Sequence, residues 1–596
     1  MFLRKTKRVK CGKTHHYWSI VENRRLPNNK VVQRHVLYLG EINDSQQYAW
    51  RKSIEIFTDD APEAKTVALF PEDRAPEVPD DQIVRIRVAE MELRRPRQFG
   101  ACWLAGQLYC QLRLDWFWAE RLPRNRKGTP WDLILQTLVT YRLISPGSEW
   151  RLHREWFDSS AMADILEEDF SLVEIHKLYE CLDKLVAHKA SLLQHLRQRW
   201  EDLYNAKFDV LLYDLTSTYF ESHPPFGEDQ PLRQFGYSRD KRPDCVQVIL
   251  ALVVTPDGLP LAYETLKGNT SDKSTLKDFL DKIESLHGKA NRIWVMDRGI
   301  PTEEVLQYMK EQKIGYLVGS PRGRLTSLEE SFLSKPWQEV RPDVLVKTNK
   351  TDDDVYVMAR SLDRQNKEQA MRQRKLKDYR DRLKELSGMK LKRDALLKKL
   401  GSAEAQATPK VAAMFDVTIE EGASNAQPQW NYKLRRDRLR IARRREGVYL
   451  LRTNLNTTDP KAIWEYYLQL VEVEQSFRDL KGDLSIRPIY HQLDRRIEAH
   501  IFVAFLAYCL HSQLRMRMKH LAPGLTPRSV LAKLNTISMV DVHLPTSDGR
   551  TVILRRHTIP EPDVKLLMDR LRLELPEQPP PRITSTQAAA ATDGVV

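Results

Sequence analysis

The segment FDVLLYDLTSTYF at residues 208–220 consists mostly of aliphatic, β-branched and aromatic residues, which favour a β-strand. Two more strand patterns follow at 246–255 and 259–266, and the Pro-Asp-Gly turn between them predicts a hairpin. Beyond the hairpin, helical patterns alternate with extended ones at 271–288, 292–297, 301–313 and 314–320. The predicted order is therefore βββαβαβ, which starts with a hairpin and finishes with parallel strands.

This order is that of the ribonuclease-H-like fold, a mixed sheet with helices on both faces. Residues 14–40 contain two β-rich runs around a Pro-Asn-Asn turn and predict a second hairpin. Residues 100–205 show helical periodicity throughout. We therefore expect an α/β protein with a ribonuclease-H-like mixed sheet, flanked by an N-terminal β-hairpin region and a helical domain. A chain of 596 residues is too long for one core, so three or four domains are expected.

The segment 361–400 interrupts the sheet pattern with 14 Lys or Arg residues against 6 Asp or Glu residues. It predicts a long basic helix or a helical hairpin, broken near Ser387-Gly388. A second basic run, KLRRDRLRIARRR at 433–445, leads into a strand pattern at 447–454. For the basic segment 361–400, two interpretations stay open: a solvated helical spacer, or direct contact with DNA.

The formal net charge of +14 and the pI of about 9.3 suit a polyanion, of which nucleic acid is the commonest. Solubility alone is the alternative explanation. The six cysteines include no CxxC pair, which argues against a zinc knuckle or a disulfide scaffold and favours a reducing compartment.

The distribution of apolar residues does not suggest a membrane protein. The basic start lacks an apolar run, so no signal peptide is expected. The longest apolar run, at 501–510, is about half the ~20 residues that a membrane span needs, and predicts a buried helix. We expect a cytoplasmic protein with no membrane partner.

Three carboxylates stand out. Asp214 and Asp297 each close a strongly apolar strand pattern, and in the expected sheet these strand ends are neighbours. Glu474 lies in the apolar helix pattern after the last strand. Together they predict an oxygen-ligand site for two Mg²⁺ ions, with Mn²⁺ as a substitute, that clamps the oxygens of an in-line phosphoryl transfer. Arg478 and Lys481 follow one and two turns after Glu474 and could hold phosphates.

Each residue also has a plainer explanation. Asp214 could be a simple strand or turn residue, and the Asp-Arg-Gly at 297–299 an ordinary turn. Glu474 and Arg478 have the spacing of a surface salt bridge. Only the joint arrangement favours catalysis.

The segment from 467 to 481 resembles the Tyr-Arg-Glu-Lys signature of DDE insertion-sequence transposases, of the insertion-sequence 4 type. Tyr467, Glu474 and Lys481 hold the signature spacings, whereas Leu470 occupies the arginine position; Arg478 is the candidate for that phosphate contact. The segments around Asp214 and Asp297, and those at 235–276 and 486–510, are also similar to these transposases. The likeness covers most of residues 10–520.

The resemblance implies DNA transposition and recombination: cleavage and strand transfer at the terminal inverted repeats of the protein's own element and into target DNA. It implies Asp214, Asp297 and Glu474 as metal-binding catalytic residues, Tyr467 and Lys481 as phosphate contacts, and action as a dimer. It also implies an insertion domain between Asp297 and Glu474. Prokaryotic cytoplasm, with nucleoid association during action, is the expected location.

Other DNA contacts are expected from the basic loop that holds Arg239, Lys241 and Arg242, for which a solvated loop is the alternative. Trp337 or Trp430 could stack on a flipped base, although a place in a small hydrophobic cluster is favoured for both. Two rival functions remain: an inactive or regulatory DNA-binding protein derived from a transposase, and a nuclease without strand transfer.

The expected division has eight parts, given in chain order. They are a β-rich region (1–56), a linker (57–99), a helical, DNA-binding domain (100–205), the first part of the ribonuclease-H-like core (206–320), a basic insertion domain (321–446), the second part of the core (447–518), a C-terminal region (519–575) and a disordered tail (576–596).

Overall fold

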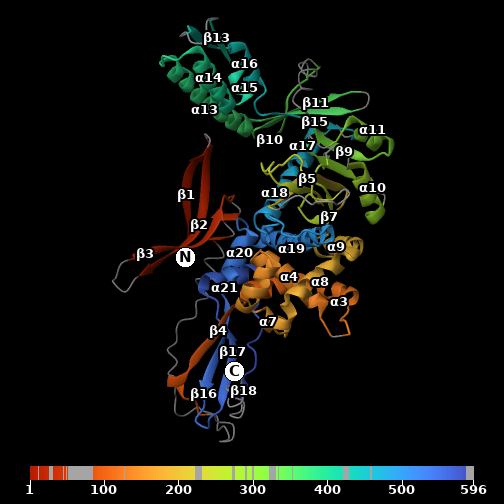
Figure 1. Ribbon diagram of the computed structural model, residues 1–596, viewed down its shortest axis with the longest axis vertical. Helices are drawn as coiled ribbons and strands as arrows, with labels where there is room; N and C mark the ends of the chain where they lie inside the picture. Colours follow the sequence, from red (N-terminus) through yellow and green to blue (C-terminus); the bar gives the residue numbers. More distant parts are fainter. Residues whose placement is uncertain are drawn as a thin grey trace. The chain divides into compact units, whose positions relative to one another are not determined.

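The computed structural model divides into two compact units, each described by itself (Figure 1). The first unit comprises Met1–Thr6, Tyr17–Arg292 and Gln469–Val596, and the second comprises Lys7–His16 and Ile293–Leu468. The described residues are 1–10, 13–25, 31–43, 46–47, 50–51, 85–126, 128–221, 231–270, 276–288, 292–297, 301–320, 331–332, 335–351, 354–420, 428–456 and 459–584.

The N-terminal region is a three-stranded sheet in the order β1 (Phe2–Lys10), β2 (Lys13–Arg25) and β3 (Val31–Gly40). Strands β2 and β3 are antiparallel, which confirms the predicted hairpin, whose turn lies outside the described residues. Strand β1 was not predicted. The acidic part of the expected linker, 57–81, also lies outside the described residues.

The helical region between 100 and 205 is built around one long apolar helix from the other end of the chain. Its longer helices are α2 (Gly100–Gln111), α3 (Leu114–Arg121), α4 (Trp131–Ile144), α8 (Ile175–Leu185) and α9 (Lys189–Tyr204). Helix α19 (Asp494–Leu521) packs against α2, α4 and α8. By length and composition α19 could cross a membrane, but 94% of its apolar window is buried inside the protein, as expected of a core helix.

The first unit also contains three antiparallel strands: β5 (Val210–Phe220), β6 (Val246–Val254) and β7 (Pro260–Lys267). Every residue of β6 is buried, because helices cover this part of the sheet. Helix α18 (Leu470–Lys481) packs on β5 and β6, while α19 and α9 pack on β7. Helix α10 (Leu276–His287) follows the hairpin.

The second unit continues with β8 (Ile293–Met296), α11 (Glu303–Glu311) and β9 (Gly315–Gly319), and β8 and β9 are parallel. The chain order from β5 to β9 is thus the predicted βββαβαβ. Next to β9, four antiparallel strands lie in the order β15 (Val448–Thr453), β12 (Val355–Ser361), β11 (Val344–Lys350) and β10 (Gln338–Arg341). The sheet is therefore mixed. Strands β10 to β12 were not predicted, although VLVKTNK and VYVMARS carry strand-forming residues.

The basic segment forms a helical lobe with a core of its own (Figure 1). Helices α13 (Leu362–Ser387) and α14 (Arg393–Ala407) are separated by a break at Ser387-Gly388, as predicted. The lobe is completed by α15 (Pro409–Ala412), β13 (Phe415–Ile419), β14 (Trp430–Leu434) and α16 (Arg436–Arg444). Trp430 packs against this core, and Trp337 against a second cluster that contains Phe332, so both tryptophans are cluster aromatics.

A four-stranded sheet near the C-terminus joins distant segments in the order β18 (Arg582–Thr584), β17 (Thr551–His557), β16 (Ser538–Pro545) and β4 (Glu92–Gln98). Two expectations were wrong here. Strand β4 lies in the stretch expected to be linker, and β18 lies in the stretch expected to be a disordered tail. Residues 585–596 lie outside the described residues. The two remaining helices of this region are α20 (Pro527–Leu534) and α21 (Pro562–Leu571).

Candidate active site

Asp214 is held in the backbone of β5. It is the fifth of eleven residues in the strand and is half-buried between buried neighbours. Its Oδ1 accepts a hydrogen bond from the backbone N–H of Leu215 at 2.7 Å. The expectation that Asp214 closes its strand was wrong, because the Thr-rich continuation up to Phe220 keeps pairing with β6. Its side chain therefore projects from the middle of a strand, where the backbone is firmly fixed.

Asp297 follows β8 directly, as predicted. Its side chain is exposed, whereas the last three residues of the strand are buried. The next residues, 298–300, lie outside the described part of the chain. Asp297 is thus carried at the end of an apolar strand in the second unit.

Glu474 lies on the exposed side of α18. Val473, Phe477 and Leu480 are buried, and α18 packs on β5 and β6. Glu474 is exposed and has no hydrogen-bond or ion-pair partner among the described residues. Arg478 donates to Gln475 Oε1 at 2.9 Å, so the described contacts do not include a Glu474–Arg478 salt bridge. An uncompensated carboxylate at this position is a suitable ligand for a hard cation.

The helix pattern expected after Asp459-Pro460 forms two helices, α17 (Pro460–Leu468) and α18, and α18 ends at Lys481. Asp214 and Glu474 therefore lie in the first unit, on elements that pack against each other, and Asp297 and Tyr467 lie in the second. The cluster of three carboxylates stays a prediction. Tyr467 packs with the rings of Tyr449 and Trp464, each at 5.9 Å between ring centroids.

Leu470, at the arginine position of the signature, is buried in the first turn of α18. An arginine here would bring a charge into the apolar contact between α18 and the strands, which is costly without a partner. The departure from the signature is therefore consistent with the local packing.

A cluster of cations surrounds one carboxylate at the end of α18. Lys481 Nζ lies 2.8 Å from Asp240 Oδ1, and the guanidinium of Arg487 contacts the same oxygen. Burial lowers the pKa of Lys481, Asp240 opposes this shift, and the charges of Arg487 and Arg239 add to it. With three cations around one carboxylate, the cluster carries excess positive charge, as an anion site requires. The sequence had suggested Lys481 and Arg239 but not Asp240 or Arg487, whose contact depends on the fold.

The basic loop is joined to the strand that carries Asp214. The backbone N–H of Arg239 donates to Ser217 Oγ of β5 at 3.2 Å. Lys241 is exposed and has a left-handed backbone conformation (φ +58°). Arg242 forms ion pairs with Asp244 at 2.9 Å and Glu221 at 3.0 Å. The charge of Arg242 is thus already paired within the protein.

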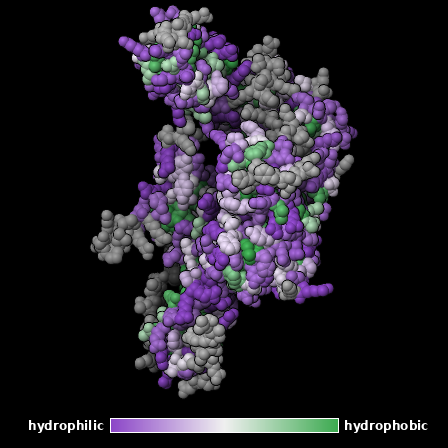
Figure 2. Space-filling model, viewed as in Figure 1, coloured by the Kyte–Doolittle hydropathy of each residue, from purple (hydrophilic) through white to green (hydrophobic). Residues whose placement is uncertain are grey.

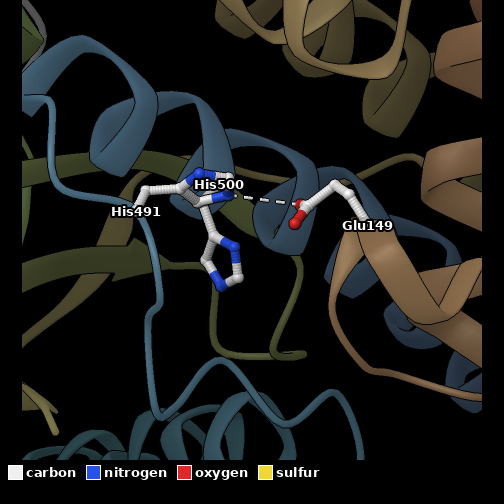
Figure 3. A group of neighbouring side chains, drawn as sticks. All are labelled: Glu149, His491 and His500. Carbon is white, nitrogen blue, oxygen red and sulfur yellow. Dashed lines mark hydrogen bonds and ion pairs between the residues drawn. The ribbon is translucent and has the colours of Figure 1, made fainter. Parts of the chain in front are cut away.

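A second polar cluster is buried where Glu149, the first residue of α5 (Glu149–Arg151), meets His491 of the segment after α18 and His500 of α19 (Figure 3). His491 Nε2 lies 3.3 Å from Glu149 Oε1, and Arg142 Nη2 lies 3.4 Å from His500 Nδ1. His500 Nε2 contacts the carbonyl of Ile486 at 3.2 Å. Both ring nitrogens of His500 are therefore engaged, and a guanidinium already supplies the positive charge, so the group is a structural network rather than a metal centre.

Charge in this network is balanced internally. Burial alone would raise the pKa of Glu149. The hydrogen bond from His491 and the nearby positive charges instead lower this pKa to about 2. Burial lowers the pKa of His500 well below its usual range, an effect to which the charge of Arg142 adds. Glu149 is thus ionised and His500 neutral near pH 7.

A third group links α18 to α19. His511 Nε2 lies 3.4 Å from Asp483, and His511 Nδ1 lies 3.7 Å from Asp479. Burial raises the pKa of Asp479 although His511 and Arg515 act in the opposite direction. Because the two ring nitrogens face different carboxylates, this group ties the end of α18 to the core helix.

Two segments of the chain match known protein families. Residues 206–510, just over half of the chain, match the family described as "Transposase DDE domain". Residues 3–59 match the N-terminal domain of the IS1634 family of transposases. One similar solved structure is a piggyBac transposase synaptic complex with hairpin DNA, with a TM-score of 0.34 and 9% identity, over 74% of this chain and 80% of that one. Among curated proteins, no relative matches the chain.

Proposed function

Because the chain belongs to the DDE transposase family and is therefore a DNA-cleaving transposase, we propose that it cuts DNA at the ends of its own insertion sequence and joins the freed ends to target DNA. The observation that carries this proposal is the packing of α18 on β5, which brings the helix of Glu474 onto the strand of Asp214 inside the family-matched segment. Asp297, at the end of β8, supplies the third carboxylate of the proposed site.

Asp214, Asp297 and Glu474 would hold two divalent ions, with Mg²⁺ as the proposed metal and Mn²⁺ as a substitute. All three offer carboxylate oxygens, which are the ligands that hard divalent cations prefer. When bound, the two metal ions would polarise the attacking hydroxyl and neutralise charge on the leaving oxygen. The uncompensated carboxylate of Glu474 supports this assignment, because a cation would complete its environment.

The cluster at the end of α18 would hold the phosphates beside the scissile bond. Lys481 and Arg487 each retain donors beyond those that Asp240 occupies, since an ammonium has three N–H groups and a guanidinium five. Arg239 adds positive charge near Lys481. Asp240 fixes Lys481 and Arg487 before DNA arrives, which reduces the entropy that binding would otherwise cost. Tyr467 and Arg478 are further candidates for contacts to the backbone.

We also propose that the protein has a Tyr-Arg-Glu-Lys signature of the insertion-sequence 4 type, altered at Leu470, on a ribonuclease-H-like core with an insertion domain. It would recognise the terminal inverted repeats of its element, with the helical region at 100–205 as the proposed reader, and act as a homodimer. Its place of action would be the prokaryotic cytoplasm, in association with nucleoid DNA.

The test is a nicking and joining assay in Mg²⁺ with DNA that carries the inverted repeats flanking the gene. Wild-type protein should nick the repeat ends and yield joined products, and Asp297→Ala should bind the same DNA without nicking. Equal cleavage by Asp297→Ala would refute the proposed site. Binding without any cleavage by the wild type would favour a regulatory DNA-binding protein, and cleavage without joined products a nuclease.

A further inference from the structure

Helix α16 carries a stripe of arginines. Arg436, Arg440, Arg443 and Arg444 are separated by four, three and one residues, a spacing that places them on one side of a helix. All four are exposed. On another side of α16, Leu439 and Ala442 pack against the core of the helical lobe. The packing of these two side chains therefore fixes the direction of the arginine stripe.

The charge of this stripe is not compensated by the protein. Residues 433–445 contain eight Lys or Arg residues and a single acidic residue, Asp437. Asp437 pairs with Arg435 at 3.3 Å, and the four stripe arginines form no ion pair with the described residues. Figure 2 shows that the lobe of α13 to α16 presents mostly hydrophilic residues on its visible face.

Helix α13 is also basic, but several of its cations are paired with carboxylates of the protein. Its Arg372 is buried in an ion pair with Glu446, and Arg364 pairs with Glu368 at 2.9 Å and contacts the hydroxyl of Tyr449. Arg382 pairs with Glu385 at 2.5 Å. At least three of the nine Lys or Arg residues of α13 are thus paired within the protein, whereas none of the four stripe arginines of α16 pairs with a described residue.

The spacing of the stripe fits a polyanion. At 1.5 Å per residue, the stripe spans about 12 Å of helix. Like charges three and four residues apart disfavour an isolated helix, so an external anion would relieve this repulsion. Double-stranded DNA carries one negative charge per ~1.7 Å of its axis, so several phosphates lie within reach of a stripe of this length.

We propose that the arginine stripe of α16 binds the phosphate backbone of double-stranded DNA and reads no base sequence. This proposal rests on the proposed function in so far as DNA is the substrate. Guanidinium groups match phosphate oxygens in a bidentate geometry. Contacts to phosphate hold a protein on the duplex but carry no base-sequence information directly. The stripe would thus add affinity for duplex of any sequence.

The test compares two quadruple variants of the full-length chain, each in an Asp297→Ala background so that cleavage does not complicate binding. The first is Arg436→Gln, Arg440→Gln, Arg443→Gln and Arg444→Gln. The control removes four exposed charges from α13 by Arg374→Gln, Lys375→Gln, Lys377→Gln and Lys384→Gln. The dissociation constant for a duplex of mixed sequence is measured between roughly 50 and 200 mM salt, a range over which phosphate contacts strongly change the affinity.

In the α16 variant, the slope of log K against log salt should become less steep by about 3 to 4, because each phosphate contact contributes about 0.9 to its magnitude. The α13 control should keep the parent slope, and both variants should keep the parent circular-dichroism melting profile. An unchanged slope in a folded α16 variant, or an equal loss in the control, would overturn the proposal. So would a stronger effect on an RNA duplex than on DNA.

The two proposals fail in different ways. If the wild type does not nick DNA but the α16 variant loses salt dependence, the catalytic proposal fails and the DNA surface remains. If nicking occurs and the slope is unchanged, only the α16 proposal fails.

Discussion

Two polar clusters of the first unit differ in their charge balance. The cluster of Asp240, Lys481 and Arg487 has more cations than anions and keeps partial exposure. In the network of Glu149, His491 and His500, the carboxylate is buried and offset by Arg142 and a histidine. The first therefore has charge available to a ligand, whereas the second has its charge compensated within the fold. Excess charge, more than the presence of ionisable groups, separates a binding site from a structural network.

The largest effect is expected for Glu474→Gln. Loss of a metal-binding carboxylate should slow nicking by at least ~10³-fold, about 4 kcal/mol of transition-state stabilisation, with DNA affinity almost unchanged. Single-turnover cleavage in Mg²⁺ measures the rate. The matched control is Glu472→Gln on the same helix, which loses only a partly exposed ion pair with Arg515 and should cleave normally. Equal slowing by both variants would point to damage of α18 itself.

A change in the buried network should affect stability instead of chemistry. Glu149→Gln removes the buried carboxylate that faces His491 and the charge of Arg142, and should cost about 3–5 kcal/mol of unfolding free energy. Denaturant unfolding of the full chain measures this, with the exposed Glu120→Gln as control. If Glu149→Gln kept full stability yet abolished cleavage, the contrast between the two clusters would be wrong.

The pH dependence of stability sharpens the same point. The pKa of Glu149 is depressed to about 2 in the folded state, against an ordinary value of 4.5. The ionised Glu149 therefore contributes about 3 kcal/mol to the free energy of unfolding. This contribution is fully present above pH ~4.5 and is lost as the pH falls toward 2. Melting temperatures of wild type and Glu149→Gln should converge over this window. Parallel curves would contradict the ionised, paired state of Glu149.

The smallest effect is expected for Asp240→Asn. Among the described residues, Asp240 is the one carboxylate that pairs with Lys481 and Arg487. Its removal raises the local positive charge, so non-specific DNA should bind roughly tenfold more tightly at low salt, about 1.4 kcal/mol. Cleavage should nevertheless slow, because the two cations lose their common anchor. Asp257→Asn, which removes an exposed pair with Lys519, is the control. Weaker DNA binding by Asp240→Asn would show that Asp240 does not restrain these cations.

Local patterns predicted much of this protein. Each strand from β5 to β9 has its own apolar run, the end of β8 at Asp297 follows directly from the sequence, and Ser387-Gly388 marks the break after α13. The contacts that define the clusters were not predictable in the same way. Lys481 contacts Asp240, which is 241 positions away in the sequence, and His491 contacts Glu149, which is 342 positions away. No local pattern specifies such a pairing.

The missed sheet has the same cause. Strand β4 has mostly exposed residues and a proline, so its sequence resembles a linker. It becomes a strand because β16 pairs with it and because buried Arg97 meets Asp164 at 2.6 Å and Asp541 at 2.9 Å. Partners more than 400 positions away thus override weak local preference.

The burial of α19 has a consequence for how this protein can be inherited. Although α19 lies mostly within the DDE segment 206–510, it packs against α2, α4 and α8, which lie outside that segment. A gene fragment that encoded the DDE segment alone would expose one of the most apolar helices of the chain to water. The helical region and the catalytic segment are therefore bound to evolve as one heritable block, and exchange of one without the other would require α19 to change as well.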